Sequence, residues 1–151
     1  MTTIDNKSIE KDYENLIHSL ENEGNYSIMN LTSSIIMTHK NTILQKLNLE
    51  RKKLKLFHKK LKKYRYCSDL SDLQFGNYIR WISLKDPEKI NLTNGAFFSD
   101  YVYTKDSVKI VCRNNRGFTF QIKFDEVIIF QKFNDQEQVL LSVMDYLSKN
   151  A

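Results

Sequence analysis

Residues 51 to 66 read RKKLKLFHKKLKKYRY, and this stretch separates two halves of the chain that follow different sequence periods. It contains nine Lys or Arg side chains and no carboxylate. Upstream of it, apolar residues recur at helical spacing, whereas downstream of Cys67 they alternate as they do in strands. The sequence therefore predicts a helical N-terminal part followed by a β-rich C-terminal part.

The first half predicts one short helix and one long helix. Apolar residues from Ile9 to Leu20 recur at helical spacing and predict an amphipathic helix over residues 8 to 22. A second apolar series follows alternating steps of four and three, the heptad pattern of a coiled coil or a long helical hairpin. The apolar positions of this heptad seam, which form the candidate partner interface, are Ile36, Ile43, Leu47, Leu54, Phe57, Leu61 and Tyr64.

The predicted second helix is too long to be covered by a small domain alone. A continuous helix from residue 28 to 65 would extend on the order of 55 Å, so part of it has to project, fold back or pair with a second chain. Two seam positions, Lys40 and Glu50, are charged, which weakens a coiled coil but can fix its register or its partner. The predicted partner of the seam is a second copy of the chain or another helix.

The positive charge of the chain is concentrated in the basic segment. Residues 46 to 65 hold ten Lys or Arg and one acid, Glu50, so this segment carries +9 while the whole chain carries +5. Solvated helices usually mix Glu with Lys, whereas the like charges here repel one another. Nucleic acid, an acidic protein surface or a membrane surface would offset this repulsion, and a simple solvated face is the fourth interpretation. The candidate phosphate contacts are Lys52, Lys53, Lys55, Lys59, Lys60, Lys62, Lys63 and Arg65.

The second half predicts five short strands. Alternating side chains and intervening turn signals place them in residues 76 to 84, 95 to 103, 107 to 113, 117 to 124 and 126 to 133. The short connections require antiparallel neighbours. Five such strands are typical of a small barrel of the Src-homology-three or Tudor kind, or of an open antiparallel sheet that packs on helices.

A last helix is predicted after the strands. Asn134 followed by Glu137 matches a capping box, and the apolar residues from Val139 to Leu147 make one helical face. The expected fold class is therefore α+β: a helical hairpin or coiled coil, a small five-stranded antiparallel barrel or sheet, and a C-terminal helix. The expected domains are residues 1 to 66 and residues 67 to 151.

The sequence contains no motif for catalysis, for a cofactor or for a metal. No P-loop, dinucleotide fingerprint, nucleophile elbow or zinc pattern is present. His18, His39 and His58 lie on predicted helices at spacings that suit neither a metal site nor a catalytic triad. Cys67 and Cys112 are too few for a disulfide scaffold and are expected as reduced thiols. A protein that is not an enzyme, without cofactor or metal, is expected.

The sequence also lacks signals for membrane insertion or export. No apolar run reaches the roughly 18 residues of a membrane span. The start, MTTIDNKSIEKD, has neither the basic beginning nor the apolar core of a signal peptide. A soluble, intracellular protein is expected.

The C-terminal half resembles a group of viral proteins. The segments that carry the resemblance are GNYIRWISL (76 to 84), LTNGAFFSDYV (92 to 102), VKIVC (108 to 112) and IIFQKFNDQEQVLLSVMDYL (128 to 147). They are similar to segments of small uncharacterised proteins of nucleocytoplasmic large DNA viruses. The resemblance implies a location in a virion or in the host cytoplasm or nucleus, and a role as a virion component or a genome-associated factor.

Two functions follow from these observations. The first is a non-catalytic assembly protein, such as a structural component of a virion, that pairs through the seam from Ile36 to Tyr64. The second is a nucleic-acid-binding protein that contacts phosphates through the basic helix 51 to 65. The two differ in salt response, because phosphate contacts weaken steeply with salt whereas an apolar seam tolerates it.

Overall fold

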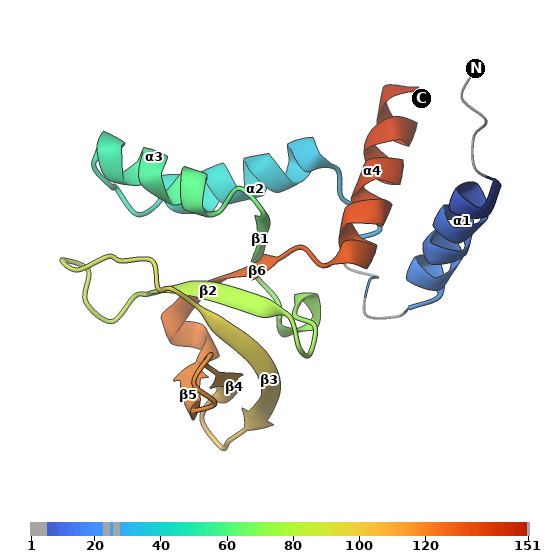
Figure 1. The fold of residues 1–151 in the computed structure, drawn as a ribbon. Helices are drawn as coiled ribbons and strands as arrows, with labels where there is room; N and C mark the ends of the chain where they lie inside the picture. The colour runs from blue at the N-terminus through green and yellow to red at the C-terminus, as the bar shows by residue number, and fades with distance from the viewer. Residues whose placement is uncertain (1–5, 23–24, 26–27, 151) are drawn as a thin grey trace. The chain divides into compact units, whose positions relative to one another are not determined.

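The computed structural model of the chain describes residues 6–22, 25 and 28–150. These residues form two compact units (Figure 1). The terminal unit contains the chain up to Ser33 and from Asn134 onward, and the sheet unit contains Ser34–Phe133. The expected boundary at residue 66 falls inside a strand, β1 (Tyr64–Cys67). None of the helices in the described ranges has the length and hydrophobicity that a membrane span needs.

The terminal unit consists of two helices from opposite ends of the sequence. Helix α1 (Asn6–Glu21) packs against α4 (Asp135–Lys149), and Leu140 of α4 is fully buried. Polar contacts add to this packing: the Asn22 side chain donates to Oε1 of Gln136 at 2.8 Å. The predicted helices over residues 8 to 22 and after Asn134 are thus both confirmed.

The start of α4 has the predicted capping box. The backbone N–H of Glu137 donates to Oδ1 of Asn134 at 2.8 Å, and the backbone N–H of Asn134 donates to Oε1 of Glu137 at 3.2 Å. These two bonds satisfy N–H groups that a helix start otherwise leaves without an acceptor.

Replacing Asn134 by Ala is therefore expected to lower the free energy of unfolding by about 1 kcal/mol. Chemical denaturation measures this change. Ser142→Ala serves as the control, because Ser142 is exposed in the middle of α4 and bonds only the carbonyl one turn earlier, that of Gln138. An equal loss in both variants would show that the cap contributes nothing beyond ordinary surface substitution.

The sheet unit contains six antiparallel strands in the order β1-β6-β2-β3-β4-β5. Five of them correspond to the predicted strands: β2 (Tyr78–Ser83), β3 (Ala96–Tyr103), β4 (Val108–Arg113), β5 (Thr119–Lys123) and β6 (Val127–Lys132). The predicted turn at Gly95 precedes β3. Its φ is 101°, and a Cβ atom there would lie 2.5 Å from the carbonyl oxygen of Ile79, so only glycine fits.

Of the two arrangements expected, the closed barrel is wrong and the open antiparallel sheet is confirmed, with six strands instead of five among the described residues. β1 pairs only with β6 and β5 pairs only with β4 among the described strands, so these two strands are the edges. A register shift between Phe98 and Asp100 bends β3, and the sheet curls strongly beyond β2 (Figure 1). The curl encloses a core without joining the edges.

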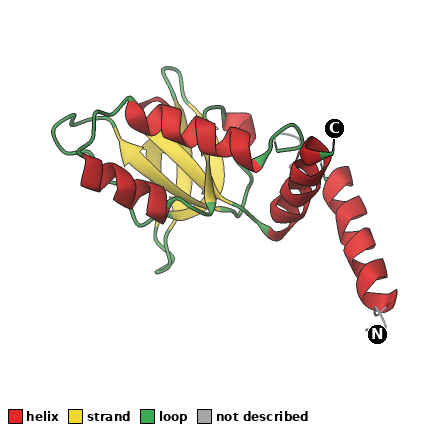
Figure 2. Ribbon diagram, turned by 90° about the horizontal axis from the view of Figure 1, so that it is seen from above, coloured by secondary structure: helices red, strands yellow, loops and turns green. Residues whose placement is uncertain are grey.

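The segment from residue 28 to 65 is not one continuous helix; of the alternatives that the sequence left open, the chain folds back. It is divided into α2 (Ser33–Gln45) and α3 (Arg51–Lys60), and the chain then enters β1. Between the helices, Asn48 has a φ of 52°, a left-handed conformation that ends a helix and that Asn tolerates better than most residues. The break lets both helices lie on one face of the sheet (Figures 1 and 2).

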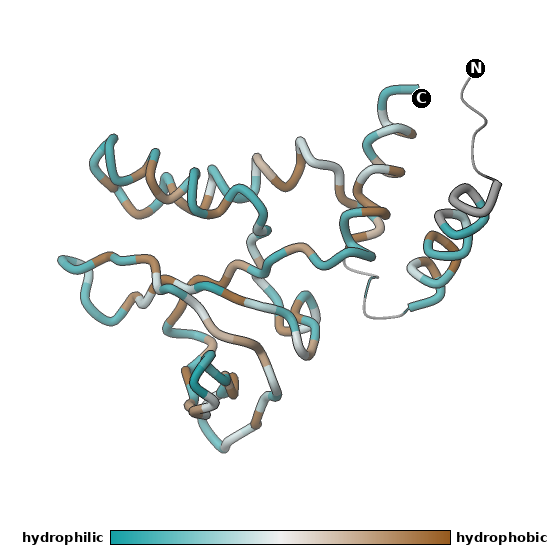
Figure 3. The backbone as a smooth tube through the Cα atoms, in the orientation of Figure 1, coloured by the Kyte–Doolittle hydropathy of each residue, from teal (hydrophilic) through white to brown (hydrophobic). Residues whose placement is uncertain are grey.

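Each face of the sheet has its own apolar core. One core lies between the sheet and the helices, where Phe57 and Leu61 of the α3 region pack with Ile128 and Phe130 of β6. The other core lies on the opposite face and includes Trp81 and Phe98. Hydrophobic and hydrophilic residues alternate along α2 and α3 (Figure 3), as expected of helices with one buried side. The heptad pattern thus describes the packing of two short helices on their own sheet.

Candidate anion-binding sites on and beside α3

Helix α3 is amphipathic, and its apolar side determines which way its charges point. Phe57 is 3% exposed and the following Leu61 is fully buried, so the side of α3 that carries them faces the sheet. Lys59 and Lys60, which lie between Phe57 and Leu61 in the sequence, are exposed on the side of α3 that faces away from the sheet. Lys59 and Lys60 lie in the last turn, where positive charge interacts favourably with the helix dipole.

Most of the predicted phosphate contacts lie on the surface. Six of the eight are exposed, and Lys53 is half-buried with its ammonium group 5.9 Å from the centre of the Phe57 ring. Arg51 is also exposed at the start of the helix. We define the α3 basic surface as the exposed cations of the helix and the turn that follows it: Arg51, Lys52, Lys55, Lys59, Lys60, Lys62 and Lys63.

Arg65 is the exception, and its assignment as a phosphate contact is corrected. It is 2% exposed, and its Nη2 donates to the carbonyl oxygen of Asp72 at 2.8 Å. Side chains alternate along a strand, so Arg65 points to the face opposite Tyr64 and Tyr66. Its guanidinium group holds the short 3-10 turn Leu70–Asp72 against the strand.

The cations of the α3 basic surface form no ion pair within the described part of the chain. The ion pairs found there join Lys85 and Lys123 to Glu126, far along the sequence from α3. The repulsion among the lysines of the α3 basic surface is therefore not offset by salt bridges.

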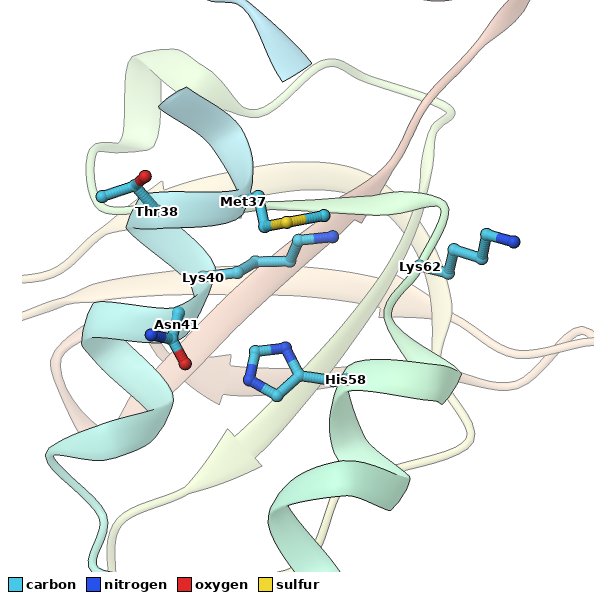
Figure 4. Close-up of a pocket in the computed structure, with 6 residues that line it drawn as sticks. All are labelled: Met37, Thr38, Lys40, Asn41, His58 and Lys62. Carbon is cyan, nitrogen blue, oxygen red and sulfur yellow. The ribbon is translucent and has the colours of Figure 1, made fainter. Parts of the chain in front are cut away.

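A groove of about 460 Å³ lies between α2 and α3 (Figure 4). Its lining has no carboxylate and consists of Met37, Thr38, Lys40, Asn41, His58 and Lys62. Figure 4 shows the Lys40 side chain extended across the groove, with His58 on the neighbouring helix α3. Lys40 is only 6% exposed, and its Nζ donates to the carbonyl oxygen of Leu61 at 2.9 Å.

The pKa values of Lys40 and His58 in this groove are both lowered. Burial lowers the pKa of Lys40, because removal from water disfavours the charged ammonium. The pKa of His58 is also lowered, first by burial and then by the positive charge of Lys40. One signal for this site was present in the sequence: Lys40 is a charged residue at a position of the mostly apolar seam.

The predicted partner-interface residues lie in the core of the sheet unit or against it. Ile36, Phe57, Leu61 and Tyr64 are buried. The other three are partly buried and pack on the core between the helices and the sheet: Ile43, Leu47 and Leu54. These apolar side chains are therefore already covered within one chain.

The remaining candidate groups do not form a site. His18 and His39 are exposed on different helices. Cys67 and Cys112 are free thiols, as predicted, and both are buried. Burial raises the pKa of Cys112 to about 12, which makes this thiol unreactive. In the ranges that the structure describes, no three His, Cys, Asp or Glu side chains gather as a metal site would require.

No protein-family model matches the chain, and no curated protein and no solved structure shows a significant match. The resemblance of residues 76 to 147 to viral proteins therefore stays a prediction. The function has to be argued from the α3 basic surface and the groove.

Proposed function

We propose that the protein binds nucleic acid without catalysing a reaction, through phosphate contacts from the α3 basic surface. One observation carries this proposal. Seven cations of a short helix and its following turn are exposed, and none has an ion-pair partner within the described residues. A phosphate backbone would supply the missing negative charge.

The dimensions of the surface suit a nucleic-acid backbone. A helix of 10 residues is about 15 Å long. Duplex DNA carries one negative charge per about 1.7 Å of its axis, so several phosphates lie within reach of such a helix. A folded acidic protein offers fewer anions over the same length, and it spaces them less regularly.

The type of side chain indicates the kind of recognition. The surface contains six lysines and one arginine, Arg51. Lysine contacts phosphate as a flexible point charge, whereas the side chain that most often forms two hydrogen bonds to a guanine base is arginine. Contacts of this kind fix position on the backbone and carry no sequence information. Binding that is insensitive to sequence is therefore expected.

Pairing of chains through the heptad seam is the other function that the sequence suggests. A partner helix on this seam would have to displace the packing of Phe57 and Leu61 on the sheet. The burial of the seam favours phosphate binding as the role of this segment. Seam pairing stays a prediction, and a core variant described in the Discussion tests it.

A salt series tests the proposed function directly. If each of the seven cations neutralises one phosphate, the logarithm of the association constant falls with the logarithm of salt concentration with a slope of about −6 for duplex DNA and about −5 for a single strand. Fluorescence anisotropy of labelled oligonucleotides measures the slope, and light scattering on the same samples gives the molar mass. A slope near zero, or no binding at low salt, would contradict the proposal.

A further inference from the structure

The groove between α2 and α3 contains the buried Lys40 side chain, and its one hydrogen bond within the described chain does not explain why a lysine is needed there. The carbonyl of Leu61 that accepts from Lys40 also accepts from the backbone N–H of Tyr64 at 3.0 Å. This carbonyl would therefore keep a donor without the lysine. A buried ammonium group costs free energy unless it is paired, and an apolar side chain of similar size would avoid that cost.

The donors of Lys40 are only partly used. An ammonium group has three N–H donors, and the carbonyl of Leu61 is the single acceptor that Lys40 contacts within the described chain. Because Lys40 lines the groove, the other donors are available to a ligand there. His58 borders the same space from α3, whereas the side chain of Lys62, in the turn after α3, points away from Lys40 and His58 (Figure 4).

The rest of the lining also favours an anion. The side-chain oxygen of Asn41 accepts from Gln45, which leaves the amide NH₂ of Asn41 as a donor. No Asp or Glu borders the groove to compete for these donors. Lys40 and Asn41 of α2 and His58 of α3 thus provide donors around one space.

We propose that this groove binds a phosphomonoester group through Lys40 and His58. A phosphomonoester carries close to two negative charges at neutral pH and has three strong acceptor oxygens, so it matches several donors better than a carboxylate or a phosphodiester does. Binding it would compensate the buried charge of Lys40 and draw a proton onto His58.

The size of the groove indicates what is attached to the phosphate. A volume of about 460 Å³ lies within the range of small-molecule sites and exceeds what a phosphate alone needs. Met37 adds an apolar part to the lining. A nucleoside monophosphate and the 5′-phosphorylated end of a nucleic-acid strand share the required group, and neither depends on the α3 basic surface for this contact.

Calorimetry with inorganic phosphate, AMP and adenosine tests the site. AMP and phosphate are expected to bind the wild-type protein, whereas adenosine is not. Replacing Lys40 by Met should weaken AMP binding by about 30-fold or more, because a hydrogen-bonded charge is lost. The melting temperature of this variant should stay equal or rise. Lys46→Met is the matched control, since Lys46 is exposed and outside the groove, and it should bind AMP normally.

His58→Gln provides a second variant in case Lys40→Met fails to fold, and it should also weaken AMP binding. In the wild type, NMR should show the His58 imidazole becoming protonated when AMP is added, an effect that a purely structural role would not produce. Absence of AMP and phosphate binding up to about 10 mM at low salt, or unchanged AMP binding in both groove variants, would overturn the proposal.

Oligonucleotides with a 5′-phosphate or a 5′-hydroxyl show whether the phosphomonoester comes from a strand end or from a free nucleotide. They also distinguish failure of the groove proposal from failure of the proposed nucleic-acid binding. A preference for the phosphorylated end that disappears in Lys40→Met would assign the site to a strand end, whereas AMP binding without that preference would assign it to the free nucleotide. If the 5′-hydroxyl strand binds and neither AMP nor phosphate does, the groove proposal fails while the proposed function stands. If AMP binds and no oligonucleotide does, the proposed nucleic-acid binding fails while the groove proposal stands.

Discussion

A variant with Lys55, Lys59, Lys60 and Lys63 replaced by Gln is expected to bind duplex DNA about a thousand-fold more weakly than the wild type at about 0.15 M salt. The four side chains are exposed on α3 and the turn after it. Each lost phosphate contact removes about 0.9 from the salt slope, so the slope should become about 4 units shallower. Anisotropy titrations at several salt concentrations measure both quantities.

The design of this variant leaves the groove intact. Lys62 is kept because it borders the groove as well as belonging to the α3 basic surface. A control with the same change in net charge replaces four exposed lysines elsewhere on the sheet unit by Gln: Lys85, Lys89, Lys105 and Lys123. This control should retain most of the affinity and nearly the full salt slope. Equal losses in the two variants would show that total charge, not the α3 basic surface, determines binding.

Replacing Phe57 by Ala is expected to lower the free energy of unfolding by about 3 to 5 kcal/mol. Phe57 is 3% exposed and packs in the core between the helices and the sheet, so the substitution leaves a cavity within one chain. The loss should not depend on protein concentration, because no second chain contributes to this packing. Urea denaturation at two protein concentrations measures the change.

Leu56→Ala is the matched control, because this neighbouring residue is 46% exposed. It should change the stability by about 0.5 kcal/mol or less. Seam pairing makes the opposite prediction for Phe57→Ala: a smaller molar mass in light scattering with little loss of monomer stability. That outcome would show that the heptad seam holds a partner chain.

The sequence predicted those parts of the fold that depend on local patterns. Strands β2 to β5 were found because their apolar and polar side chains alternate, and β6 because its apolar run is short and follows a turn signal; turn residues such as Gly95 separate the strands. The cap at Asn134 was found because its two partners are three residues apart. In each case the deciding contacts lie within a few residues of one another.

The parts that could not be predicted depend on distant contacts. β1 is buried on nearly every residue, so it shows no alternation, and Leu61 and Tyr64 happen to continue the heptad spacing of α2 and α3. The break between the helices depends on a single residue, Asn48, in a left-handed conformation. Whether a curled sheet closes depends on its two edges, which no local pattern describes.

The residues of the candidate sites also differ in whether a local pattern or a distant contact places them. The exposed lysines of α3 follow from its amphipathic pattern, which is why most were predicted. Arg65 was assigned wrongly because it belongs to a strand, where alternation and not helical spacing determines its direction. The groove joins Lys40 to His58 across the break between the helices, so it appears only once the chain has folded back.

The pairing of β1 with β6 also has a consequence for synthesis of the protein. Tyr64 lies opposite Lys132, so β1 leaves the ribosome long before the strand that covers it. Until then, Phe57 and Leu61 of the nascent chain have no sheet to pack against, and they stand beside a dense cluster of lysines. Contacts this distant in sequence slow folding and leave apolar surface open to other molecules. The apolar side of α3 is therefore exposed in the nascent chain until β6 has been synthesised.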